Sequence, residues 1–97
     1  MPRPSLDRAI ERILEKDKRY ATDAYRFVND AVHFTVKSLR KNGIKGGDNP
    51  HVTGQELLQG IRRYALDQYG PMAHALFEFW GVRTSEDFGE LVFNLVD

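Results

Sequence analysis

The stretch TDAYRFVNDAVHFTVKSLRK, residues 22–41, decides the fold class of this protein. Mostly apolar side chains recur along it every three or four residues, which is the period of an α-helix. They form two adjacent rows, one with Tyr25, Val28, Val32, Thr35 and Leu39 and one with Ala24, Phe27, Ala31 and Phe34. Because only a narrow polar strip remains, this helix must contact neighbours on two sides. The stretch therefore predicts a helical bundle.

The flanking segments also have a helical period. Residues 5–16 read as an ordinary amphipathic helix. Further along, Thr53 and Glu56 have the T-x-x-E spacing of a capping box and predict the start of a helix that ends at Gly70. Pro71 is suited to open the next helix. Residues 72–80 are apolar on nearly every side, which predicts a central, mostly buried helix.

The last segment, residues 86–96, fits two interpretations. Its apolar residues fit helical spacing, but Leu91, Phe93 and Leu95 also alternate with polar residues as in a strand. A helix is preferred because Thr84 and Ser85 resemble a helix start, with the strand as the alternative. In a helix Phe93 lies off the main apolar row and is expected to be exposed, and Gly89 suggests a close approach of another helix. The expected architecture is one all-α domain over residues 1–97, a compact bundle of four to five helices.

The composition excludes several classes of protein. The 97 residues contain 14 Lys and Arg, 14 Asp and Glu, and 41% hydrophobic residues, so a core is expected and a globally basic nucleic-acid binder is not. The absence of cysteine excludes disulfides, thiolate metal sites and cysteine nucleophiles. Because the sequence contains neither a signal peptide nor an apolar stretch long enough to span a membrane, a cytoplasmic protein without membrane contact is expected.

The zero net charge conceals an uneven distribution. Residues 1–50 carry a net charge of +4 and residues 51–97 a net charge of −4, so the basic and acidic parts are expected to meet, within one chain or between two. A basic run contains Lys37, Arg40, Lys41 and Lys45. It has two interpretations: cations that complement the dipole at a helix C-terminus, or a contact for RNA or another polyanion.

No catalytic, metal or cofactor motif is found. His33, His51 and His74 lack metal-ligand spacing, and the glycine-rich loop 42–51 lacks the strand and the Gly-Lys-Ser/Thr of a phosphate-binding loop. No enzyme, cofactor or small-molecule substrate is therefore expected; a catalytic site would need His51, Glu56, Arg62 and Tyr64 around one pocket. DNA is not expected as a partner either, because the last segment of a would-be helix-turn-helix is acidic and has no Lys or Arg.

Six blocks of sequence carry a resemblance to a known family. They are Asp17-x-Arg19-Tyr20, Ala24-Tyr25-x-Phe27-Val28, 51–57 (HVTGQEL), Gly70-Pro71-x-Ala73, Trp80-Gly81-Val82 and 87–96 (DFGELVFNLV). Together they resemble a family of small uncharacterised proteins from planctomycetes, verrucomicrobia and related bacteria. The resemblance implies no activity, cofactor or site residue. It does imply a further acidic, aromatic segment after the last block, which would cover the final helix.

Two functions remain as expectations. The preferred one is a protein-interaction module without catalytic activity, which binds a protein partner or a second copy through Phe93, Leu91 and Val96. The alternative is an RNA- or ribosome-associated protein that uses Lys37, Arg40, Lys41 and Lys45, together with Arg62 and Arg63.

Overall fold

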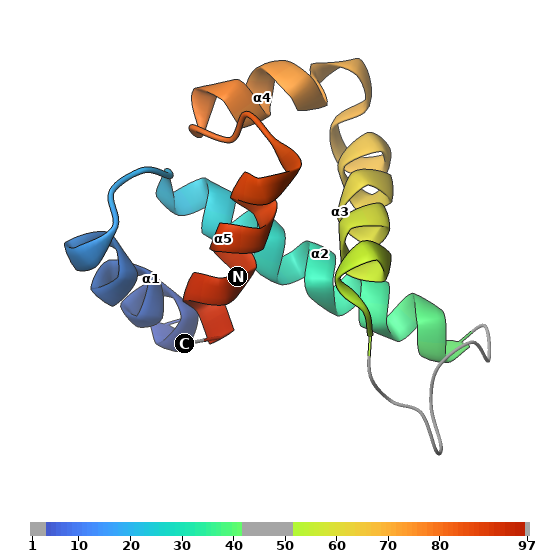
Figure 1. Ribbon diagram of the computed structural model, residues 1–97, viewed down its shortest axis with the longest axis horizontal. Coiled ribbons are helices and arrows are strands. Elements are labelled where there is room, and N and C mark those ends of the chain that lie inside the picture. The colour runs from blue at the N-terminus through green and yellow to red at the C-terminus, as the bar shows by residue number, and fades with distance from the viewer. Residues whose placement is uncertain (1–3, 42–51, 97) are drawn as a thin grey trace.

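The second helix forms the centre of the molecule (Figure 1). The computed structural model describes residues 4–41 and 52–96, and all regular structure in these ranges is helical. The helices are α1 (Pro4–Lys16), α2 (Thr22–Lys41), α3 (Gly54–Tyr69), the short 3-10 helix η1 (Gly70–Met72), α4 (Ala73–Phe79) and α5 (Ser85–Val96). The predicted all-α bundle is confirmed, and the last segment is a helix rather than a strand.

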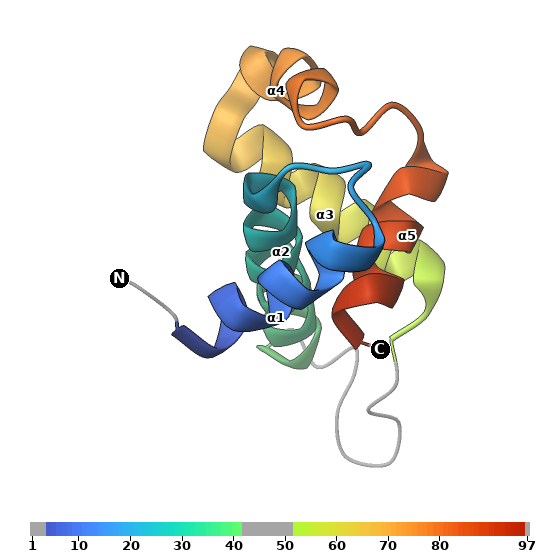
Figure 2. The same cartoon turned by 90° about the vertical axis from the view of Figure 1, so that its left-hand side faces the viewer.

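Helix α2 packs against α1, α3 and α5, as its two apolar rows require (Figures 1 and 2). Tyr25, Val28 and Ala31 have no exposed surface. In the same helix, Phe27 places its ring centroid 5.6 Å from Tyr64 of α3 and 5.3 Å from Phe77 of α4. Full burial of one large apolar side chain contributes about 1.5–3 kcal/mol. Because α2 buries more side chains than any other described helix, it supplies the largest part of the core.

Helix α4 is not the central, buried helix that its composition predicts. It has seven residues and lies at one end of the bundle (Figure 1). Only its inner row is buried, from Ala73 at its start to Trp80, the residue that follows its last turn. On its outer side Phe79 is 83% exposed and Met72, in the preceding η1, is 67% exposed. The prediction was wrong because a helix this short covers the end of α2 with one row and has no neighbour among the described residues on the other.

Two glycines allow close contact between segments of the core. Gly60 of α3 lies against the buried Thr35 of α2, and a Cβ at Gly60 would overlap the Thr35 side chain. Gly81 has φ 90°, a backbone conformation that favours glycine, and a Cβ there would overlap the carbonyl oxygen of Arg19. Nearby, the Ala21 N–H donates to the Trp80 carbonyl over 3.1 Å. These contacts fix the α1–α2 turn against the α4–α5 turn.

Both helices that flank the groove described below begin with a capping box. Thr53 accepts from the backbone N–H of Glu56, and the Glu56 carboxylate accepts from the Thr53 N–H, as predicted. At α5 the Asp87 carboxylate accepts from the backbone N–H of Thr84 over 3.0 Å, and the Thr84 hydroxyl accepts from the Asp87 N–H over 3.4 Å. Asp87 and Thr84 thus cap the start of α5 reciprocally.

Candidate functional site

An apolar groove lies between α3 and α5. It has a volume of about 180 Å³, and Ser85 provides the only polar side chain of its lining. The lining residues are Gly54, Leu57, Leu58 and Ile61 of α3 and Ser85, Phe88, Gly89 and Val92 of α5. At one end Arg62 donates to the Ser85 hydroxyl over 3.5 Å. The groove suits apolar groups and offers few hydrogen bonds.

Gly54 and Gly89 keep this groove open. A Cβ built at either glycine meets no atom of the described chain within 4 Å. The close helix approach predicted at Gly89 is therefore wrong, because Gly89 faces the open side of α5 and not a packed neighbour. Gly89 lies inside α5, where glycine costs about 1 kcal/mol relative to alanine, whereas Gly54 is the first residue of α3.

The apolar lining continues onto the exposed side of α5. Phe93 is 64% exposed, as its helical position predicts, and Val96 is 82% exposed. Both follow Gly89 at helical spacing, four and seven residues later, and so lie along the same side of α5. Leu91 was expected to share this surface, but it is fully buried in the core because it lies on the opposite, inward row.

The exposed side of α5 is acidic near its N-terminus. Glu86 is exposed, and no partner is found for its carboxylate in the described chain. Glu90 accepts from Arg19 over 3.2 Å, and both side chains are about half exposed. This pair joins the basic and acidic parts of the chain within one molecule, as the charge distribution predicts. Neither carboxylate lines the groove, and Glu90 is turned toward the α1–α2 turn.

A polar network behind α5 was missed by sequence reasoning. The Asp17 carboxylate accepts from Arg19 Nη2 over 2.7 Å and from the Asn94 amide over 3.2 Å, and Asn94 also donates to Tyr25 Oη. Hydrogen bonds from the Arg19 side chain hold the pKa of Asp17 well below its usual range. Burial raises the pKa of the Tyr25 phenol. The available signal was the D-x-R spacing, in which the aspartate accepts from the backbone two residues later.

Asp87 forms the second part of this network. Its carboxylate accepts from the Tyr20 hydroxyl and from the backbone N–H of Arg83, in addition to Thr84. The hydrogen bond from Tyr20 lowers the pKa of Asp87, and burial raises the pKa of Tyr20. Because the polar atoms bond to one another, the network holds α5 in place.

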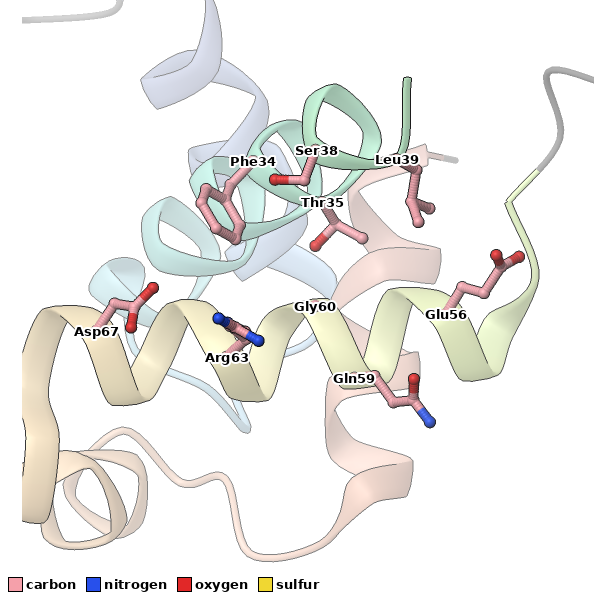
Figure 3. Close-up of a pocket in the computed structure, with 9 residues that line it drawn as sticks. All are labelled: Phe34, Thr35, Ser38, Leu39, Glu56, Gln59, Gly60, Arg63 and Asp67. Carbon is pink, nitrogen blue, oxygen red and sulfur yellow. The ribbon is translucent and has the colours of Figure 1, made fainter. Parts of the chain in front are cut away.

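A hollow of about 730 Å³ lies between α2 and α3 (Figure 3). Its lining is mixed: α2 contributes Phe34, Thr35, Ser38 and Leu39, and α3 contributes Glu56, Gln59, Gly60, Arg63 and Asp67. The Thr35 hydroxyl donates to the Ala31 carbonyl over 2.8 Å, and Glu56 caps α3. Arg63 and Asp67 bring opposite charges to one wall, which selects neither anions nor cations.

The three described residues of the hypothetical catalytic set, Glu56, Arg62 and Tyr64, do not form a cluster. Arg62 contacts Ser85 on the α5 side of α3, whereas Tyr64 stacks on Phe27 and Phe34 on the α2 side. The Glu56 carboxylate is engaged by the Thr53 N–H. His51 lies outside the described residues. The structure therefore does not bring Arg62, Tyr64 and Glu56 to one pocket.

The basic run lies only partly within the described chain. Lys37 and Arg40 are exposed on the last two turns of α2, where cations complement the helix dipole. Lys41 ends α2, and Lys45 falls outside the described residues. Arg62 and Arg63 are exposed on α3. Both interpretations of the run, dipole complement and polyanion contact, stay open.

The described histidines have local partners. His33 Nδ1 lies 2.7 Å from the Asn29 carbonyl oxygen, and His74 Nε2 lies 3.2 Å from Glu78. Over residues 4–41 and 52–96 no group of three or more metal-ligating side chains is found. In the same ranges none of the helices has the length and apolar character needed to cross a bilayer.

Helices α3 and α5 thus expose an apolar groove, with Phe93 and Val96 exposed further along α5. The resemblance of the six sequence blocks to a planctomycete and verrucomicrobial family stays a prediction. No family model, curated protein or solved structure matches this chain.

Proposed function

We propose that the protein is a cytoplasmic protein-interaction module without catalytic activity, which binds its partner through the exposed side of α5. The observation that carries this proposal is Phe93, which is 64% exposed on a well-capped helix directly beside an apolar groove. Exposed aromatic side chains at the edge of an apolar depression are typical anchors of protein interfaces. We also propose a bacterial source, because the six sequence blocks resemble a family of bacterial proteins.

Capture experiments with tagged protein in a lysate of the source organism test the proposal. Wild type is compared with Phe93→Asp and with a matched control, Leu66→Asp, because Leu66 is 65% exposed on α3 and does not line the groove. We expect a protein that is retained by wild type and Leu66→Asp and lost with Phe93→Asp. Captured proteins that are the same for all three variants would contradict the proposal.

Light scattering during size-exclusion chromatography shows whether the partner is a second copy. A dimer that Phe93→Asp dissociates and Leu66→Asp does not would identify the module as a homodimer. Circular dichroism of both variants checks that the helices are retained, which is expected because both side chains are about two-thirds exposed.

A further inference from the structure

We draw no further inference here: the strongest candidate, the apolar groove between α3 and α5, carries no proposal because nothing in the structure shows what covers it.

Discussion

Gly60 and Gly89 are both helical glycines, but they lie in opposite surroundings. At Gly60 the missing side chain lets α3 approach Thr35 of α2, so the packing of the two helices depends on it. At Gly89 the missing side chain leaves open space. The same residue type therefore marks internal packing at one site and a free surface at the other.

Alanine substitutions should change stability in opposite directions at these two positions. Gly60→Ala forces Thr35 to move and should lower the free energy of unfolding by about 1–3 kcal/mol. Gly89→Ala meets no neighbour and should raise it by about 0.5–1 kcal/mol through helix propensity. Urea denaturation of the two variants and wild type measures both effects. A lower stability of Gly89→Ala would contradict the open surroundings described for Gly89.

At the scale of an element, the first turn of α5 is tied to the α1–α2 turn through Asp87. Asp87 accepts hydrogen bonds from the backbone N–H groups of Arg83 and Thr84 and from the Tyr20 hydroxyl, so one carboxylate both caps α5 and ties it to the α1–α2 turn. Phe88 and Leu91 then pack the helix against α4 and the core. This anchoring keeps Phe93 and the groove wall in place.

Replacing Asp87 by alanine should destabilise the protein by about 1–3 kcal/mol, because the cap and the hydrogen bond from Tyr20 are lost together. The adjacent acid provides the control: Glu86 lies in the same first turn but makes none of these hydrogen bonds, so Glu86→Ala should cost only about 0.3–1 kcal/mol through the helix dipole. Thermal denaturation followed by circular dichroism compares the two. Equal losses would show that the cap contributes little.

At the scale of the whole molecule, the turn between α1 and α2 is fastened to α5 by ionised groups. Asp17 and Asp87 both have a lowered pKa in the folded protein, Asp17 chiefly through hydrogen bonds from Arg19 and Asp87 chiefly through the hydrogen bond from Tyr20. A carboxylate with a lowered pKa stabilises the folded state at any pH above its unfolded pKa, about 3.9 for aspartate. That contribution disappears as the pH falls toward the folded pKa.

We therefore expect the free energy of unfolding to fall progressively when the pH is lowered from about 5 to 2. Asp17→Asn should be less stable than wild type near neutral pH and should show a shallower acid slope, since the titrating group is gone. Glu11→Gln, on the exposed side of α1, serves as the control and should keep the wild-type slope. Urea unfolding at a series of pH values gives the slopes; parallel curves for wild type and Asp17→Asn would contradict this linkage.

Much of the fold follows from local sequence. The two apolar rows of residues 22–41 predict a helix with neighbours on two sides, and the T-x-x-E at Thr53 predicts the start of α3, because these signals depend on residues within one or two turns of each other. The central position predicted for residues 72–80 was wrong. An all-round apolar composition cannot distinguish a buried helix from a short one with an unpartnered side.

The sequence by itself determined that this chain is a helical bundle without a recognisable catalytic motif, and that Phe93 lies off the buried row of the last helix. Only the tertiary structure decided that Leu91 is core, that α4 is peripheral, and that Gly54 and Gly89 face one groove. The physical reason is distance along the chain. Helical periodicity and capping are local interactions, whereas a groove is formed by two helices that begin about thirty residues apart and are brought together by packing against α2.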